Sequence, residues 1–364
     1  MKHAQKFVVA MSGGVDSSVA AALLVEQGHE VTGLFMRLGN PAPADTAGNT
    51  SNTRGCCSVA DAHDARFVAG KLGIPFFALN FAAEFDGIID YFVSEYIRGR
   101  TPNPCVVCNR QLKFGRLLEY ARFIGADAVA TGHYARIVNH DGRPRLLRAL
   151  DRDKDQSYVL FELGPDALAK TAFPIGDMTK DQVRRLAAGL GLPVHDKPDS
   201  SDICFVPDRD YTNLIRQRRP DALKPGDVRD QAGRLLGRHE GVAGFTIGQR
   251  RGLRIALGAP AYVTGLDAAT NTVTVGTREQ LHRRGLVADR VCWHIDEPAA
   301  PIRADVQIRY AHTAAPATIE HMEGGRAKIT FDRPQPAIAP GQAAVFYCGD
   351  MVIGGGWIER SFDA

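Results

Sequence analysis

The sequence predicts an α/β fold: a Rossmann-like, doubly wound parallel sheet followed by a small linking domain and a C-terminal β-barrel. Three observations predict it. The first 135 residues alternate apolar strands with helical segments. A Gly-Gly turn joins the first strand to the first helix. After about residue 210 the hydrophobic period shifts toward two. We therefore expect domains at 1–210, 211–285 and 286–364.

The first expected element is a buried strand, because residues 7–11 are a continuous apolar run. Gly13 and Gly14 follow it and allow a sharp turn and a close approach of the backbone to a ligand. A helix is then expected at 19–27, ended by Gly28. Its expected cap residues are Asp16, Ser17 and Ser18. A ring of backbone N–H groups at a helix N-terminus favours an anion, so this turn is a candidate anion site.

Further strands are expected at 31–36, 75–79 and 126–131, and helices at 59–72, 85–97 and 113–124. Thr179 and Gln182 form a capping box for a helix that ends at Leu190. Ligands bind at the carboxyl ends of parallel strands. The Ser12 loop, Met36 and residues 132–134 should therefore meet at one edge of the sheet.

The second half should be antiparallel, because apolar residues alternate with polar ones at 306–310 and 327–331. Turns between strands are expected at 265–267 and 323–325. Residues 38–55 are rich in Pro, Ala, Gly, Thr and Asn and are expected to form a surface loop.

Composition indicates an ordinary globular protein of two or three domains, with 364 residues, 45% hydrophobic and 23% charged. No apolar run has the length of a membrane span. The first strand starts about six residues in, so we expect no signal or transit peptide and a cytoplasmic location. Seven cysteines do not indicate a disulfide scaffold, and clustered thiols in a reducing compartment favour metal binding or chemistry.

Positive charge is concentrated in residues 209–260, which hold eleven Lys/Arg and five Asp/Glu, whereas the whole chain has a net charge of +3. A basic segment outside the candidate anion site favours an anionic macromolecular partner. A solvated charged surface would give the same composition.

The segment 99–109 contains the pair Cys105 and Cys108 in a Cys-x-x-Cys spacing. Two prolines are expected to make it a stiff loop between two helices. The spacing alone leaves four alternatives open: a zinc site, an iron–sulfur site, disulfide exchange, or two thiols without a special role. Cys204, in 200–205, adds a third thiol in a polar loop. We leave the adjacent pair Cys56 and Cys57 open between sulfur relay and no role. Cys292 and Cys348 are interpreted as thiols of the β-region.

The first turn, Ser-Gly-Gly-Val-Asp-Ser, lacks the Gly-Lys-Ser/Thr of a Walker A loop and resembles the loop of the PP-loop ATP pyrophosphatase superfamily. Further motifs resemble the MnmA family of tRNA-specific 2-thiouridylases, and the resemblance runs from Met11 to about Trp357. These motifs are Gly-Arg-Thr-Pro-Asn-Pro (99–104), Ala-Thr-Gly-His-Tyr (130–134), Asp-Lys-Asp-Gln-Ser-Tyr (153–158), Asp-Ile-Cys-Phe (202–205), Gly-Gln-Arg-Arg-Gly-Leu (248–253) and Pro-Gly-Gln-Ala-Ala-Val-Phe-Tyr (340–347).

The resemblance implies a tRNA-uridine 2-sulfurtransferase. ATP, with Mg²⁺, adenylates the 2-carbonyl oxygen of the wobble uridine in lysine, glutamate and glutamine tRNAs. Sulfur then displaces AMP and gives 2-thiouridine. The implied partners are tRNA and a persulfide-carrying sulfur-donor protein, with no membrane. The target base must leave its stack to meet ATP.

The resemblance also implies residue roles. Cys108 matches the nucleophilic cysteine and Cys204 the cysteine that carries the persulfide. The ATP-binding positions are Ala10, Met11, Ser12, Gly13, Gly14, Val15, Asp16, Ser17, Met36 and Gly132. Asn103, Pro104 and Cys105 match the segment that meets the target base. The tRNA-contact positions are His133, Lys154, Asp155, Gln156, Arg309, Tyr310 and Gln342.

Cys105 departs from well-known members of the family, which carry an acid there. Two mechanisms therefore stay open. In one, Cys204 carries a persulfide and transfer ends in a Cys108–Cys204 disulfide that needs a reductant. In the other, Cys105, Cys108 and Cys204 hold three irons of a 4Fe–4S cluster whose fourth iron binds sulfide.

Two other classes of function are compatible with the first loop. A PP-loop ligase that forms amides would need an ammonia or amine source, and no glutaminase-like region is visible in the sequence. A non-catalytic RNA-binding or iron–sulfur scaffold would keep the motif but would not release pyrophosphate.

Overall fold

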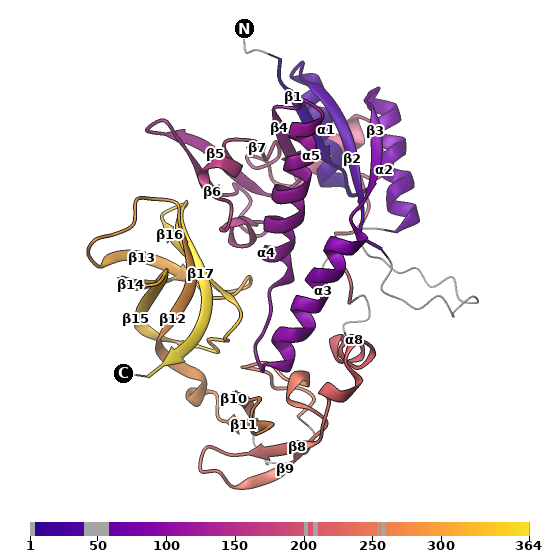
Figure 1. Ribbon diagram of the computed structural model, residues 1–364. Coiled ribbons are helices and arrows are strands. Elements are labelled where there is room, and N and C mark those ends of the chain that lie inside the picture. Colours follow the sequence, from indigo (N-terminus) through magenta and orange to yellow (C-terminus); the bar gives the residue numbers. More distant parts are fainter. Residues whose placement is uncertain are drawn as a thin grey trace, which may run out of the picture. The chain divides into compact units, whose positions relative to one another are not determined.

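The computed structural model describes residues 4–39, 58–199, 203–206, 210–253, 255 and 260–363. The chain divides into two compact units (Figure 1). The first comprises residues 1–88 and 105–209, and the second 89–104 and 210–364. Each is described by itself. Within the described ranges, no helix combines the length and the apolar character needed to cross a bilayer.

The first unit is built on the predicted parallel sheet, with strand order β3-β2-β1-β4-β7. Its central strands are buried on both faces, as their unbroken apolar sequences require. The order reverses direction at β1, so the switch point of the sheet lies between β1 and β4. The strands are β1 (Lys6–Ala10), β2 (Glu30–Arg37), β3 (Phe76–Asn80), β4 (Ala128–Thr131) and β7 (Thr171–Ala172).

The helices α2 (Val59–Leu72) and α7 (Lys180–Gly189) confirm their predictions, and the capping box of Thr179 and Gln182 is present. Helix α3 (Ala82–Ile97) also forms as expected and continues from the first unit into the second. Helix α1 (Val15–Glu26) begins earlier than predicted. Gly14 is its N-cap, so Asp16, Ser17 and Ser18 lie within the first helical turns, and the prediction that they cap the helix from outside was wrong.

A helix also replaces the loop expected around Cys105 and Cys108. Three helical segments follow one another without a break: α4 (Pro104–Cys108), the π-helix η1 (Asn109–Arg116) and α5 (Leu117–Phe123). Pro104 does not prevent this, because proline is tolerated at the first position of a helix, where its missing N–H has no partner. The first unit is completed by β5 (Ala135–His140), β6 (Arg143–Arg148), η2 (Ser157–Leu160) and α6 (Pro165–Leu168).

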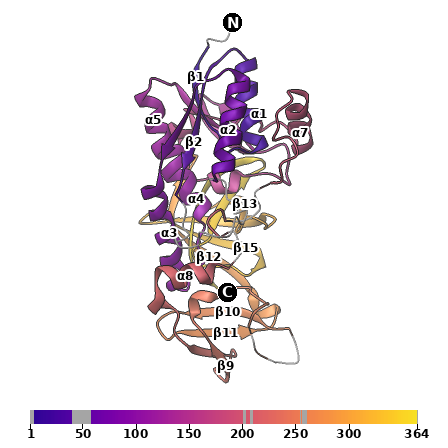
Figure 2. The same ribbon diagram turned by 90° about the vertical axis from the view of Figure 1, so that its right-hand side faces the viewer.

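The second unit begins its long segment with α8 (Tyr211–Arg218) and a four-stranded sheet of order β10-β11-β8-β9 (Figure 2). The turn expected at 265–267 lies instead inside β10, and the chain reverses after Asp267. The remaining elements here are β8 (Gly226–Arg229), β9 (Leu235–His239), β10 (Tyr262–Asp267), β11 (Thr272–Gly276), η3 (Pro220–Ala222), η4 (Val242–Gly244) and η5 (Glu279–Leu281).

The C-terminal β-barrel is closed by pairing of its first and last strands, in the order β12-β15-β14-β13-β16-β17. Ala327, Ile329 and Phe331 alternate into its core, as their spacing predicts. The predicted strand at 306–310 ends at Gln307, so Tyr310 lies beyond it. The strands are β12 (His282–Trp293), β13 (Ile302–Gln307), β14 (Ala315–Met322), β15 (Arg326–Pro336), β16 (Ala343–Cys348) and β17 (Met351–Phe362).

Candidate active site

The parallel sheet brings the three predicted loops together at one edge. Ala10, the last residue of β1, pairs with Leu34 of β2 on one side and with Thr131 of β4 on the other. The loop after Ala10, the end of β2 at Met36, and Gly132 therefore leave the sheet side by side. This is the carboxyl edge at the switch point, where ligands bind in such sheets.

Two glycines let the loop pack at backbone distance. Gly13 has a φ of 75°, and a Cβ there would lie 2.2 Å from the carbonyl oxygen of Asp61. A Cβ on Gly132 would lie 2.5 Å from the backbone nitrogen of Ser17. Both positions exclude any side chain, so the loop and the start of α1 are held between α2 and the end of β4.

The hydroxyl of Ser17 folds the loop back on itself. It accepts a hydrogen bond from the backbone N–H of Ser12 at 3.1 Å and lies 3.3 Å from the Ser12 hydroxyl. Ser17 is buried, whereas Ser12 is exposed. The loop and the start of α1 thus form the strand–turn–helix arrangement on which the predicted anion site depends.

Asp16 is paired with a lysine that sequence reasoning missed. The Lys180 ammonium lies 2.9 Å from each carboxylate oxygen of Asp16, and the Tyr134 hydroxyl donates to the same carboxylate at 2.8 Å. Burial and then the Asp16 charge raise the pKa of Tyr134. Lys180 is itself buried, at the first position of α7. No local pattern identifies it, since only the fold brings α7 to the loop.

Asp199 gathers three cations beside this pair. Its carboxylate accepts hydrogen bonds from Lys180 at 2.8 Å, Lys154 at 2.9 Å and Arg184 at 3.0 Å. Burial opposes ionisation, but the hydrogen bonds from Lys180 and Lys154 outweigh it and lower the pKa of Asp199 to about 2. Lys180 is therefore shared between the loop and Asp199, five residues before Cys204.

A second lysine holds the same segment to the loop. The Lys197 ammonium donates to the carbonyl oxygen of Gly13 at 2.9 Å and to the carboxylates of Asp61 and Asp64 at 2.7 Å each. Burial lowers the pKa of Lys197, but the hydrogen bonds that it donates to the two aspartates dominate, and the net shift is upward. The chain leading to Cys204 is thus fixed to the loop at two points.

His133, expected to contact tRNA, is buried with both ring nitrogens bonded. Its Nε2 lies 3.2 Å from the Lys113 ammonium, and its Nδ1 lies 2.7 Å from the Thr131 hydroxyl. An ammonium only donates, so Nε2 accepts and the proton sits on Nδ1. Burial, and then the Lys113 charge, lower the pKa of His133 well below its usual value.

A pH dependence of stability follows from this neutral imidazole. Below pH 6.5 the unfolded chain binds a proton at His133 that the folded chain does not, so stability falls as the pH falls. Between pH 7.5 and 5.5 the wild type should lose about 1 kcal/mol more unfolding free energy than His133→Gln. Urea unfolding at both pH values measures this difference. His63→Gln, which removes an exposed imidazole, is the control. Equal losses in wild type and His133→Gln would contradict the assignment.

The predicted tRNA-contact residues 154–156 have different surroundings. The Asp155 carboxylate accepts from Arg148, from the backbone N–H of Ala149 and from both donors of Ser157, and its side chain is 7% exposed. The side-chain oxygen of Gln156 accepts a hydrogen bond from the backbone N–H of Tyr134, and the backbone N–H of Gln156 donates to the carbonyl oxygen of Tyr134. Asp155 and Gln156 therefore stabilise the turn. Of the three side chains, that of Lys154 is 39% exposed.

The three predicted functional cysteines lie on two elements. Cys105 is exposed and Cys108 half-buried on α4, while Cys204 is half-buried in the turn before Phe205, whose ring packs edge-on against Phe85. Among the described residues, which include all three thiols, no three Cys, His, Asp or Glu side chains lie close enough to share a metal ion. In the part of the chain that the structure describes, the three cysteines of the iron–sulfur alternative therefore do not form such a group.

The remaining predicted residues belong to the second unit. The Gln342 amide donates to the carbonyl oxygens of Thr101 and Pro102, at 3.2 and 3.0 Å. It therefore anchors the segment that leads to Asn103 and Pro104, both of which are buried. Arg309 donates to the carbonyl oxygen of Pro336 at 3.1 Å. Tyr310 is 51% exposed.

Several predicted positions lie outside the described residues. These are Cys56 and Cys57, residues 200–202 of the Cys204 motif, and Arg254 of the basic segment.

Comparison with known proteins matches almost the whole chain. Residues 5–208 match the profile of a tRNA methyl transferase HUP domain, 212–277 a tRNA methyl transferase PRC-barrel domain, and 283–358 an aminomethyltransferase beta-barrel domain. The tRNA-specific 2-thiouridylase MnmA of Geotalea uraniireducens is 50% identical over 98% of this chain and 96% of its own. That of Clostridium perfringens is 48% identical, with 98% of each chain covered.

Among solved structures, a 4-thiouridine synthetase–RNA complex with bound ATP has a TM-score of 0.36 and 14% identity, over 60% of this chain and 51% of that one. A likeness of this size carries no functional argument.

Proposed function

Since the chain belongs to the tRNA-specific 2-thiouridylase family MnmA, we propose that it converts the wobble uridine of lysine, glutamate and glutamine tRNAs to 2-thiouridine in the cytoplasm. The observation that carries the proposal is full-length identity of about half the residues, combined with a glycine-cradled loop at the switch point of the sheet. The test is tRNA-dependent release of pyrophosphate together with detection of 2-thiouridine in the three tRNAs.

In the first half-reaction the uridine O2 attacks the α-phosphorus of ATP, and pyrophosphate leaves. The loop from Ala10 to Ser17, with Met36 and Gly132, would bind ATP. Its support is the place of this loop at the start of α1 and at the switch point of the sheet, where Gly13 and Gly132 leave no room for a side chain. Asp16 offers carboxylate oxygens of the kind that Mg²⁺ prefers, and Mg²⁺ would offset charge on the leaving pyrophosphate. The Lys180 ammonium lies beside Asp16 and would also offset the negative charge of the leaving pyrophosphate.

In the second half-reaction Cys204 carries a persulfide, loaded by a sulfur-donor protein. Its terminal sulfur attacks C2 of the adenylated uridine, and AMP leaves. The Cys108 thiolate then attacks the Cys204 sulfur, which breaks the S–S bond, leaves 2-thiouridine and forms a Cys108–Cys204 disulfide. An external thiol reductant restores both thiols. In this route Cys105 carries no sulfur.

No step is assigned to an iron–sulfur cluster, because the described residues do not gather Cys105, Cys108 and Cys204 around one metal position. The two routes differ in an observable way. Colourless, iron-free protein that thiolates tRNA from a persulfide donor would support the disulfide route. Stoichiometric iron and sulfide in anaerobically purified protein would overturn it.

The competing classes of function predict other outcomes. An amide-forming ligase would release pyrophosphate with a small substrate and without tRNA. A scaffold would release none. Release that depends on tRNA is therefore the discriminating observation.

We also propose that Arg250 and Arg251 contact phosphates of the tRNA. Both are exposed and stand in the basic segment of the second unit. Each phosphate contact adds about one unit to the slope of log affinity against log salt. The double variant Arg250→Gln/Arg251→Gln should therefore flatten this slope by roughly two units. Filter binding across a salt series measures it. Arg234→Gln, an exposed arginine paired with Asp230, is the control. A slope equal to the wild-type slope would show that both arginines are only solvated.

A further inference from the structure

A π-helix begins directly after the proposed nucleophile Cys108. Over η1 the backbone bonds reach one residue further than in an α-helix, and the N–H of Leu117 donates to the carbonyl oxygen of Leu112, five positions back. π-helices are rare, and they occur frequently at functional sites. This one separates the cysteines of α4 from α5, whose Leu117, Leu118 and Ala121 are buried in the first unit.

The burial pattern contains one extra residue in this stretch. Counting back from Leu117, α-helical spacing would bury residues 113 and 110 on the same face. Those residues are Lys113 and Arg110, and Arg110 is exposed. Phe114, three positions back, is buried as α-helical spacing requires, but the next buried residues are Leu112 and Asn109, five and eight positions back. The π turn therefore keeps the apolar face continuous from α4 to α5 and keeps the cation of Arg110 out of the core.

Gly115 is the residue that permits this turn. A Cβ on Gly115 would lie 2.9 Å from the carbonyl oxygen of Arg110, five positions back. That oxygen belongs to the backbone and cannot move aside without disturbing the helix. An alanine at 115 is therefore incompatible with the π register as it stands, whereas alanine favours an α-helix.

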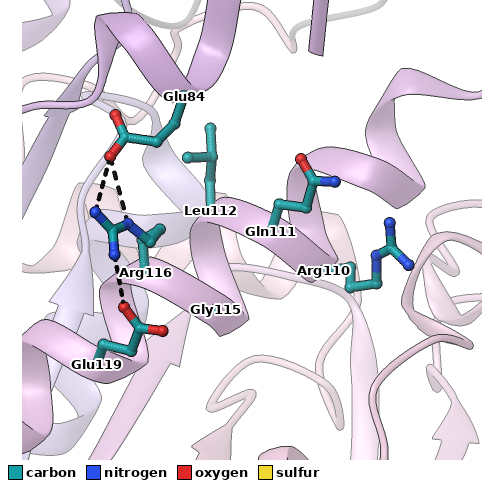
Figure 3. Close-up of a pocket in the computed structure, with 7 residues that line it drawn as sticks. All are labelled: Glu84, Arg110, Gln111, Leu112, Gly115, Arg116 and Glu119. Atoms are coloured by element: carbon teal, nitrogen blue, oxygen red, sulfur yellow. Dashed lines mark hydrogen bonds and ion pairs between the residues drawn. The ribbon is translucent and has the colours of Figure 1, made fainter. Parts of the chain in front are cut away.

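The π-helix is tied to its surroundings from several sides. The amide of Asn109 donates to the carbonyl oxygen of Val159 at 2.9 Å, and Lys113 bonds to His133. On the outer face Arg116 bonds to Glu84 and Glu119 (Figure 3). Gly115 lines the same hollow of about 350 Å³ as these three residues. These contacts fix the register at both ends of the turn.

We propose that Gly115 is a positioning residue for sulfur transfer: by permitting the π register, it sets the direction in which Cys108 faces. This inference rests on the proposed role of Cys108. Conversion of η1 to α-helix without loss of a residue rotates α4 against α5 by about 100°, the turn of one α-helical residue. Helix α5 is anchored by Leu117 and Leu118 and α4 by Val106, so such a rotation changes the direction in which the cysteines of α4 face relative to α5.

The test compares Gly115→Ala with Gly70→Ala. Gly70 lies in α2, and a Cβ there would meet nothing within 4 Å, so this control should keep full activity. For Gly115→Ala we expect tRNA-dependent pyrophosphate release within about twofold of wild type and formation of 2-thiouridine at least tenfold slower. Alkylation at limiting iodoacetamide should also change its ratio between Cys105 and Cys108, a readout that needs no activity. Activity and alkylation equal to those of Gly70→Ala would overturn the proposal.

Deletion of Gly115 distinguishes an effect on the helical register from an effect on folding. It places Leu112, Asn109 and Val106 four, seven and ten positions before Leu117, which is the α-helical spacing of one face, and it brings the buried Phe114 from three positions to two before Leu117. The deletion should therefore thiolate tRNA better than Gly115→Ala, even if the alanine variant folds poorly. Thiolation no better than that of the alanine variant would refute the register argument. Failure of the proposed function would appear separately, as wild type that does not thiolate tRNA or Cys108→Ser that does.

Discussion

Replacing Cys108 with serine is expected to stop thiolation of tRNA while tRNA-dependent release of pyrophosphate continues. A serine hydroxyl cannot act as a thiolate at neutral pH, so it does not attack the Cys204 sulfur and the S–S bond is not broken. In the proposed route, activation of the uridine does not use Cys108. We expect formation of 2-thiouridine to fall by about 10³-fold or more. Nucleoside mass spectrometry and a pyrophosphate assay on the same samples give the two rates.

Cys204→Ser should likewise stop thiolation while pyrophosphate release continues, because it removes the sulfur atom that carries the persulfide. Cys348→Ser, which changes an exposed thiol at the end of β16, is the matched control and should keep both rates. Cys105→Asp should also keep activity, since Cys105 carries no sulfur in the proposed disulfide route. Loss of pyrophosphate release in Cys108→Ser would instead place this cysteine in the activation step.

Replacing Asp16 with alanine is expected to abolish tRNA-dependent release of pyrophosphate and to leave tRNA binding intact. Asp16 is the carboxylate at the first turn of α1, where the phosphates of ATP would lie, and it orients the ammonium of Lys180. We expect a loss of about 10²- to 10³-fold or more. Lys180 keeps Asp199 as a partner at 2.8 Å, so the variant should still fold.

The control for Asp16→Ala is Asp181→Ala, which removes an exposed acid next to Lys180 in the same helix. Thermal melting and tRNA affinity should match wild type in both variants. If Asp16→Ala turns over at the wild-type rate, the loop does not have the role assigned to it.

Much of the fold was predictable because the signals are local. Period-two alternation marked the barrel strands, and a capping box marked the start of α7. An apolar run followed by two glycines marked the candidate ATP site. Each signal spans at most about ten residues and depends little on the rest of the chain. The start of α1 was misplaced because Asp16, Ser17 and Ser18 have the chemistry of caps, whereas Gly14 took that position.

The chemistry of the first unit was only partly visible in the sequence. The motifs named Asp16, Cys108 and Cys204, but the pairing of Asp16 with Lys180 joins residues 164 positions apart. Such a pair forms only because β1, β4 and α7 meet at one edge of the sheet. The ion pairs of Asp199 also depend on the tertiary structure, since its three cationic partners come from separate segments.

By itself, the sequence determined the alternating strands and helices of the parallel sheet, the strand–turn–helix loop and the family, because these reside in patterns along the chain. Only the tertiary structure decided the direction of several side chains. Asp155 and Gln342, expected at the RNA, use their polar atoms on neighbouring backbone or side-chain groups. The π-helical register before α5 could not be predicted either, because the periodicity that indicates a helix in a sequence is that of 3.6 residues per turn. It exists because packing on both sides demands one apolar face, and Gly115 leaves room for the extra residue that this requires.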